Sequence, residues 1–276
     1  MRAGGISNRT EEPMTENPQR PAALITGASS GIGRAIVNVL LDLGYEVIGI
    51  GRHFQDANDP AAFHSIQHVG TPLREGSVPF HPICQDLTRT GELTELIRRL
   101  KKEYTFSVLV NNAGVGYFGP HEEQSPAKIH EMTAVNLEVP LLLANLLLRD
   151  LKQTSGAVIN ISSVTALKSS PHGCAYGATK AALTAFTESL FDEVRKYGVR
   201  VSVIHPDMTQ SNFYRNADFT TDIAEDAYLT AETVADAVRY LLTAPSGCVP
   251  TSMTLQPQKH RIRRKSAQPS CASREI

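Results

Sequence analysis

A tyrosine and a lysine stand four positions apart in the run AYGATKAAL, residues 175 to 183. This alanine-rich run predicts a helix, and residues at that spacing are neighbours on one helix face. Tyr176 and Lys180 could therefore bring a phenol and an ammonium group to one point in space. Such pairs also occur on helix surfaces that carry no chemistry, so the interpretation depends on the rest of the chain.

A glycine-rich stretch, TGASSGIGRA, follows the first predicted strand and leads into a predicted helix. Glycines at such a turn let the backbone approach a pyrophosphate, and the helix N-terminus offers free N–H groups. A glycine turn can also be only a tight connection, and the spacing differs from GxGxxG, but the strand-to-helix context favours phosphate binding. The predicted cofactor contacts here are Gly27, Ser29, Ser30, Gly31, Ile32 and Gly33.

The end of the second predicted strand, IGIGRH, indicates which dinucleotide would bind. A dinucleotide site usually places an acid about 20 residues after the glycine loop, where it holds the ribose hydroxyls. Here Gly51 offers no carboxylate, and Arg52 offers a positively charged fork suited to a phosphate. We therefore predict NADP(H) in preference to NAD(H), with Arg34 as a possible second contact. The alternative is that Arg52 is only a solvated strand end.

Short β-branched runs alternate with longer amphipathic stretches from residue 21 onward. This alternation predicts an α/β fold, a doubly wound Rossmann-type parallel sheet of about seven strands with helices on both faces. Ser125 with Pro126, and Thr230, are helix start signals, and Pro140 predicts a kink. The proline-rich connection between Arg52 and Asp86 predicts one short helix. The strand candidates are ALIT, EVIGI, SVLVN, GAVINIS and VRVSVIH.

Length and composition predict one domain over residues 21 to 258, after a flexible extension at 1 to 20 and before a basic tail at 259 to 276. The chain has 27 Lys and Arg against 28 Asp and Glu, a balance that favours a small-molecule partner over nucleic acid or a membrane. We read the tail as a solvated end. Four scattered cysteines without metal-ligand spacing, no signal peptide and no segment approaching a membrane span predict a cytoplasmic protein without a metal site.

Several motifs together resemble the short-chain dehydrogenase/reductase family over about residues 21 to 255. TGASSGIG matches its TGxxxGxG cofactor loop, NNAG at 111 to 114 matches its fourth-strand motif, and YGATK matches its YxxxK motif. Ser163 lies 13 residues before Tyr176, the spacing of that family's catalytic serine. Asn136, within AVNLEVP, matches the asparagine of its helix-kink motif.

The resemblance implies an oxidoreductase that interconverts a carbonyl and an alcohol by hydride transfer, with Tyr176 as general acid/base. It also implies that Lys180 lowers the pKa of Tyr176 and holds the nicotinamide ribose. The physics is consistent, because an opposite charge favours the ionised form of a phenol. Ser163 should hydrogen-bond the substrate oxygen, and Asn136 should position a water behind Lys180. Ser162 is the alternative to Ser163, but adjacent strand residues point in opposite directions, and the 13-residue spacing favours Ser163.

The resemblance also implies that Asp86 contacts the adenine edge, although Asp86 could equally cap the following helix. Two features depart from the family pattern: Asp207 stands where the family has a glycine, and its C-terminal DGG segment is missing. His205 is interpreted as a strand-end residue rather than a catalytic one. The remaining cofactor contacts that the resemblance implies are Leu87, Asn112, Ala113, Gly114, Tyr176, Lys180, Pro206, Thr209 and Ser211.

Substrate contacts are expected from residues 164 to 174 and 208 to 226. The candidates lean apolar, which predicts a small or medium hydrophobic ketone, aldehyde or alcohol; alternatively, several only pack a lid. Two other functions stay open: a catalytically silent NADP(H)-binding sensor or scaffold, and an isomerase or dehydratase on the same fold. The resemblance implies a homodimer or homotetramer. The candidate substrate contacts are Leu167, His172, Met208, Phe213, Tyr214 and Phe219.

Overall fold

The computed structural model describes residues 21–54, 79–259 and 261–265. The N-terminal extension, the short helix expected between Arg52 and Asp86, and the end of the basic tail lie outside these ranges.

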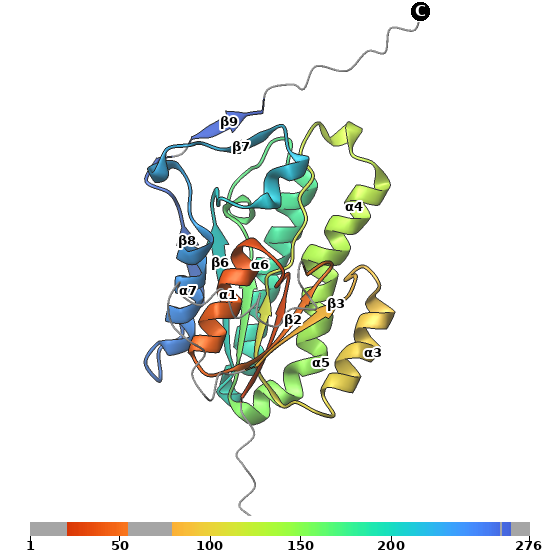
Figure 1. Ribbon diagram of the computed structural model, residues 1–276, viewed down its shortest axis with the longest axis vertical. Helices are drawn as coiled ribbons and strands as arrows, with labels where there is room; N and C mark the ends of the chain where they lie inside the picture. Colours follow the sequence, from red (N-terminus) through yellow and green to blue (C-terminus); the bar gives the residue numbers. More distant parts are fainter. Residues whose placement is uncertain (1–20, 55–78, 260, 266–276) are drawn as a thin grey trace, which may run out of the picture.

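A parallel sheet of seven strands forms the centre of the molecule (Figure 1), in the order β3-β2-β1-β4-β5-β6-β8. The predicted doubly wound α/β fold is confirmed. β3 is an edge strand, where Pro82 removes no hydrogen bond from an inner ladder. The strands are β1 (Ala22–Thr26), β2 (Glu46–Gly51), β3 (Phe80–Cys84), β4 (Phe106–Asn111), β5 (Ala157–Ile161), β6 (Arg200–Pro206) and β8 (Ser252–Leu255).

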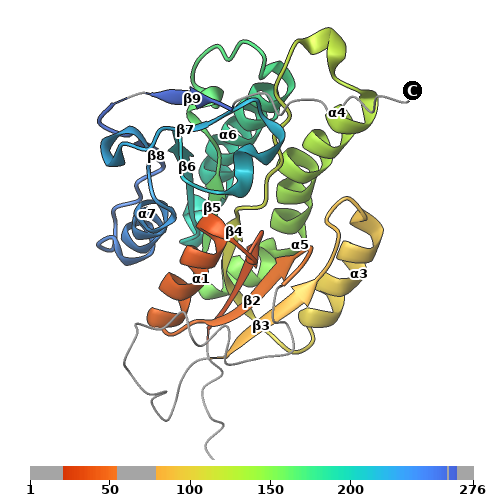
Figure 2. The same cartoon turned by 45° about the horizontal axis from the view of Figure 1, so that its top comes forward.

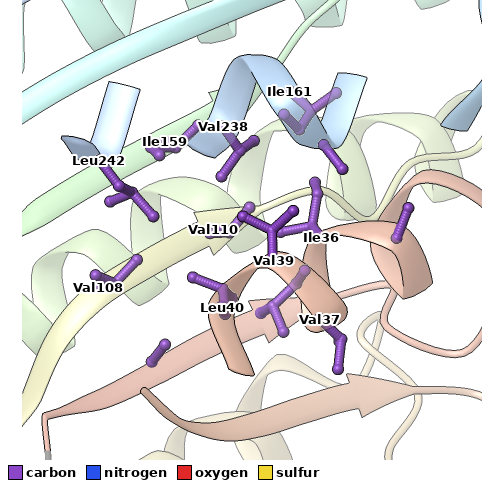
Figure 3. Close-up of a cluster of buried hydrophobic side chains, with 14 of the residues drawn as sticks. Ile36, Val37, Val39, Leu40, Val108, Val110, Ile159, Ile161, Val238 and Leu242 are labelled. Atoms are coloured by element: carbon purple, nitrogen blue, oxygen red, sulfur yellow. The ribbon is translucent and has the colours of Figure 1, made fainter. Parts of the chain in front are cut away.

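Helices cover both faces of this sheet, because the side chains of each strand alternate between two apolar layers. On one face, α1 (Gly31–Asp42) and α7 (Ala231–Thr243) pack side by side. Figure 3 shows this layer, in which Ile36 and Val238 meet Val110 and Ile159 of the sheet. The other face is covered by α3 (Thr90–Leu100), α5 (Val139–Thr154) and α6 (Cys174–Val194).

α4 (Pro126–Thr133) continues into α5 through a π-helical turn, Ala134–Glu138. Pro140 has no N–H to donate to the carbonyl of Asn136, which accounts for the wider turn at the expected kink. The hydroxyl of Ser125 caps α4 by accepting from the Lys128 N–H. The whole run, Pro126–Thr154, is long and apolar enough to span a membrane, so the expectation that no segment approaches such a span was wrong. Half of its most apolar window is buried against the rest of the protein, as in the core helix of a globular fold.

Short helical turns connect the main elements. Thr230 caps α7 as expected, because its hydroxyl accepts from the Thr233 N–H at 3.2 Å. The 3₁₀ turns are η1 (His121–Glu123), η3 (Val164–Ala166), η4 (Arg195–Tyr197), η5 (Asn212–Asn216) and η6 (Glu225–Ala227).

The basic tail is more than the solvated end expected from the sequence. Its residues Ile262–Arg264 form strand β9, which pairs antiparallel with β7 (Phe219–Thr221) beyond the main sheet (Figure 2). Lys265 fixes the pair to η5: its Nζ donates to the carbonyls of Tyr214 at 2.6 Å and Arg215 at 3.2 Å. Lys259 adds an ion pair with Asp226 at 2.6 Å. The tail therefore straps down the segment between β6 and α7.

Replacing Lys265 with Met should loosen this segment without unfolding the protein. The variant removes two hydrogen bonds to backbone carbonyls, so amide hydrogen exchange across residues 213 to 221 should quicken by about threefold or more. Hydrogen exchange followed by mass spectrometry measures the change. Arg263→Met removes the same charge from an exposed position on β9 and should leave exchange at residues 213 to 221 unaltered. Equal exchange in both variants would refute the strap.

His205 lies on β6, as the sequence predicted, and is fully buried. Its Nε2 shares a hydrogen bond with the Thr184 hydroxyl at 3.1 Å, and Thr184 in turn contacts the Ser162 hydroxyl at 3.1 Å. Burial lowers the pKa of His205, because an imidazolium ion would lose its hydration in this position. The neutral imidazole is thus part of the core network between β5, β6 and α6.

His205 should make the protein less stable in mild acid. In the unfolded chain His205 takes up a proton near pH 6.5, whereas folded His205 resists protonation. The stability that the neutral imidazole contributes is therefore complete above pH 6.5 and is lost as pH falls through the lower folded-state pKa. Urea unfolding at pH 7.5 and pH 5 should show a larger loss of stability in the wild type than in His205→Gln. Replacing the exposed His121 with Gln is the matched control and should retain the wild-type pH dependence.

Candidate active site

A cleft of about 440 Å³ runs along the carboxyl ends of the strands, where parallel sheets commonly bind their ligands. The glycine loop after β1, the end of β2, the loop after β4, the start of α6 and the segment after β6 line its walls. Every predicted catalytic and cofactor residue except Asn136 and Arg34 lies on the cleft wall. Asn136 is buried immediately behind it.

The glycine loop has the backbone geometry that a pyrophosphate site requires. Gly27 and Gly31 have φ values of +69° and +52°, a region that disfavours side chains. A Cβ on Gly33 would overlap the carbonyl oxygen of Gly27, so the turn closes tightly onto α1. Ser30 begins α1 without capping it, and no acidic side chain occupies the first turn. The N–H groups at this helix end are therefore available to a phosphate, and this part of the cleft fits a dinucleotide.

Arg52 and Asp86 also line the cleft, and Gly51, directly before Arg52, lies against Ser29 of the glycine loop. The side chain of Arg52 is 47% exposed and lines the cleft directly after β2. Asp86 accepts hydrogen bonds from both the N–H and the hydroxyl of Thr88, and these bonds lower its pKa. Asp86 therefore closes a turn ahead of α3 instead of capping it, while still facing the cleft next to Leu87. Arg34 is exposed and is not among the residues that line the cleft.

The NNAG segment forms the floor of the cleft. Thr26, at the end of β1, accepts from the N–H groups of Asn112 and Ala113 at 3.2 and 3.1 Å. The Asn112 amide donates back to the carbonyls of Thr26 at 3.0 Å and Gly27 at 3.2 Å. This exchange ties the glycine loop to β4. Sequence reasoning missed Thr26, although its position at the strand end beside Gly27 is a usable signal.

Asn136 sits in the π-helical turn and connects three segments. Its Oδ1 accepts from the Val115 N–H at 2.8 Å, and its Nδ2 donates to the Val115 carbonyl at 2.9 Å and the Thr179 hydroxyl at 3.1 Å. The amide thus pins the loop after β4 against α6. A Cβ on Gly114 would lie 3.5 Å from both Asn136 Oδ1 and Lys180 Nζ, so the two side chains border the same space. Whether Asn136 also positions a water stays a prediction.

The two adjacent serines after β5 point in different directions. The Ser163 hydroxyl acts on the phenol of Tyr176, whose pKa it tends to lower. Ser162 is turned away from that phenol, and its hydroxyl donates to the Lys180 carbonyl at 3.0 Å in the layer of Thr184 and His205. The geometry therefore favours Ser163 as the serine that would meet a substrate beside Tyr176.

Tyr176 and Lys180 share one face of α6, both nearly buried, with 6% and 3% of their surfaces exposed. Lys180 Nζ donates to the Ile161 carbonyl at 2.8 Å and lies 5.9 Å from the Tyr176 ring centroid. Burial lowers the pKa of Lys180 to about 8. Burial also raises the pKa of Tyr176 well above its usual range, with the nearby Tyr214 adding to the increase. The cost of dehydrating a phenolate dominates the net pKa of Tyr176, and the lowering effect expected of Lys180 stays a prediction.

Aromatic rings cover the Tyr176 phenol. The ring centroids of Phe118 and Phe213 each lie 5.5 Å from that of Tyr176. Tyr214 packs on Phe213 at 5.4 Å, and its pKa rises to about 12 through burial. Since Phe213 and Tyr214 belong to η5, the segment strapped by β9 forms the roof over the phenol. Tyr176, Phe213 and Tyr214 all line the same cleft.

Of the other substrate candidates, Phe219 packs on Phe118 and Tyr214 in the same aromatic group. Met208 is buried. Leu167 is 55% exposed and borders a separate shallow hollow, and His172 lines neither hollow in the described ranges. Sequence reasoning missed Phe118, whose role depends on where the loop after β4 meets η5.

Asp207 replaces the family glycine without strain. Asp207 is not among the described residues with positive φ, so the backbone at this position does not require a glycine. Its Oδ1 accepts from the Met208 N–H at 2.9 Å, and its Oδ2 accepts from the Gln256 amide at 3.3 Å. Thr209 donates to the Asp207 carbonyl at 2.9 Å. The three expected contacts in this segment all line the cleft: Pro206, Thr209 and Ser211.

Sequence reasoning missed two charged residues of the cleft wall, Glu131 and Arg215. Glu131 lies on α4, far along the chain from Arg52, and its carboxylate approaches Arg52 to 3.5 Å. No motif marks it, because only the packing of α4 brings it to the cleft.

Comparisons with known proteins agree with this fold and cleft. The family model for short chain dehydrogenases matches residues 21–221. An uncharacterized oxidoreductase of Staphylococcus epidermidis is 32% identical over 237 residues, which is 85% of this chain and 96% of the relative.

Two solved structures are similar in fold and sequence. An alcohol dehydrogenase from the archaeon Thermococcus sibiricus, complexed with 5-hydroxy-NADP, has a TM-score of 0.74 and 27% identity over 87% of this chain and 98% of that chain. A metagenomic short-chain oxidoreductase in complex with NADP has a TM-score of 0.70 and 26% identity over 86% and 97%. Another protein of this fold, a 3-ketoacyl-(acyl-carrier-protein) reductase from Brucella melitensis, is complexed with NADH. The chain therefore belongs to the short chain dehydrogenase family and is an oxidoreductase acting on CH–OH or C=O groups.

Proposed function

We propose that this chain is an NADP(H)-dependent oxidoreductase that interconverts a carbonyl and an alcohol, with Tyr176 as general acid/base. The observation that carries this proposal is the meeting of four groups at one end of a dinucleotide-shaped cleft. Tyr176 lines the cleft together with Ser163 and shares its helix face with Lys180, while Asn136 holds the loop after β4. A nicotinamide bound in this cleft would supply or accept the hydride.

The chain's own residues would handle the substrate oxygen and its proton. An oxygen placed beside Ser163 and Tyr176 would receive two hydrogen bonds as negative charge develops on it. Tyr176 would donate its phenolic proton to that oxygen, and Ser163 would hold the geometry. Lys180, largely cationic at neutral pH with its pKa near 8, would stabilise the phenolate that remains. Asn136 would keep the loop after β4 in register with α6.

Burial leaves Tyr176 in the protonated form that can donate to a substrate oxygen. A carbonyl oxygen needs this form as it becomes an alkoxide. The aromatic roof of Phe118, Phe213 and Tyr214 excludes water and suits an apolar-leaning ketone or aldehyde.

NADP(H) is proposed over NAD(H) because the end of β2 supplies Arg52 and no carboxylate. Arg52 lines the cleft, and its planar fork matches a 2′-phosphate. The bound NADP of two similar structures is consistent with this preference. The homodimer or homotetramer and the cytoplasmic location stay predictions.

Replacing Tyr176 with Phe should nearly abolish turnover while cofactor binding survives. The variant removes the transferable proton but keeps the packed ring, so kcat/KM should fall by about 10²- to 10⁴-fold. The loss is measured as NADPH oxidation with a panel of ketones and aldehydes, and binding as reduced-nicotinamide fluorescence. If Tyr176→Phe turns over like the wild type, Tyr176 is not the proton donor.

Replacing Arg52 with Ala should weaken NADPH selectively. Loss of a charged hydrogen-bond partner for phosphate should raise the NADPH Kd by about 10- to 100-fold and leave the NADH Kd within about twofold. Fluorescence titration with each cofactor measures both constants. Arg98→Ala, on the exposed face of α3, is the control for a lost positive charge. An equal loss for both cofactors would contradict the phosphate contact.

A further inference from the structure

Arg52 already has an anionic partner inside the cofactor cleft. Its NH1 lies 3.5 Å from Oε1 of Glu131, with the two side chains 47% and 26% exposed. Both residues line the cleft, Arg52 after β2 and Glu131 on α4. The ion pair therefore joins two separate elements of the cleft wall.

A second contact fixes the Glu131 carboxylate. Its Oε2 accepts a 2.6 Å hydrogen bond from the hydroxyl of Tyr117, in the loop after β4. This bond raises the pKa of Tyr117, since a phenolate there would face the carboxylate. Lys128 Nζ lies 5.3 Å from the centre of the Tyr117 ring and helps to hold it. One carboxylate oxygen is thus anchored while the other is turned toward Arg52.

We propose that Glu131 competes with the cofactor's 2′-phosphate for Arg52 and so limits the preference for NADPH over NADH. The proposal rests on the NADP(H) assignment above. To bind a phosphate through two of its N–H groups, the Arg52 guanidinium must turn away from Glu131. If it stays paired with Glu131, the phosphate and the Glu131 carboxylate are brought close together. Either course weakens the binding of NADPH. The binding of NADH is not weakened, because NADH has no 2′-phosphate. Glu131 is thus a specificity-determining residue supplied by α4 instead of β2.

The test is the full-length Glu131→Gln variant, titrated with NADPH and NADH by nicotinamide fluorescence. Glutamine keeps an oxygen that can accept from Tyr117 and loses the charge. The NADPH Kd should fall by about two- to fivefold, the size expected when an exposed ion pair no longer competes, while the NADH Kd is unchanged. Glu122→Gln removes an equal charge from the exposed turn before α4 and should alter neither constant.

A double variant separates competition for Arg52 from simple repulsion. In an Arg52→Ala background, Glu131→Gln should give no further change in the NADPH Kd, because the guanidinium for which Glu131 competes is already gone. The proposal is overturned if Glu131→Gln still lowers the NADPH Kd without Arg52, or if it lowers the NADPH and NADH Kd values equally. It is also overturned if Glu131→Gln alone changes neither Kd. If Arg52→Ala itself leaves the ratio of the two Kd values unchanged, the proposed NADP(H) preference fails instead.

Discussion

All seven strands of the central sheet run in one direction, and this constraint places every candidate site residue. Parallel strands end at a common edge, so the loops after β1, β2, β4, β5 and β6 meet there although they are far apart in the chain. Each connection needs a helix to return, and the helices bury both faces of the sheet. The same packing that stabilises the fold therefore brings the glycine loop, Arg52 and Tyr176 to one cleft.

Burial decides the electrostatics at the catalytic end. Lys180 keeps a hydrogen-bond partner in the Ile161 carbonyl, yet dehydration still lowers its pKa. The same dehydration holds Tyr176 in its neutral form under Phe118 and Phe213. The contacts of Lys265 with η5 connect the rings over Tyr176 to the tail.

At the cofactor end, two charges of opposite sign face the same ligand. Arg52 is proposed to attract a phosphate, and Glu131, which accepts a hydrogen bond from Tyr117, is proposed to oppose it. The carboxylate beside Arg52 thus comes from α4 and not from the end of β2. Asp207 stands in place of a glycine and is accommodated by the Met208 N–H and Gln256.

The sequence by itself determined the fold class, the cleft-lining glycines, Arg52, and the set of Asn136, Ser163, Tyr176 and Lys180. These features depend on local spacing: a helix brings residues four apart together, and a strand end followed by glycines forms a phosphate turn. Ser163 could be preferred to Ser162 because alternation along a strand is also local.

Only the tertiary structure decided the features that depend on where distant segments pack. Glu131 lies at the cleft because α4 packs beside it. Strand β9 pairs with β7, although more than forty positions of the chain separate the paired residues. The raised pKa of Tyr176 follows from burial under rings of other elements, a cost that no spacing reveals. Side-chain patterns repeat every two or three to four residues, so they fix local elements, whereas desolvation and charge pairing depend on the packed whole.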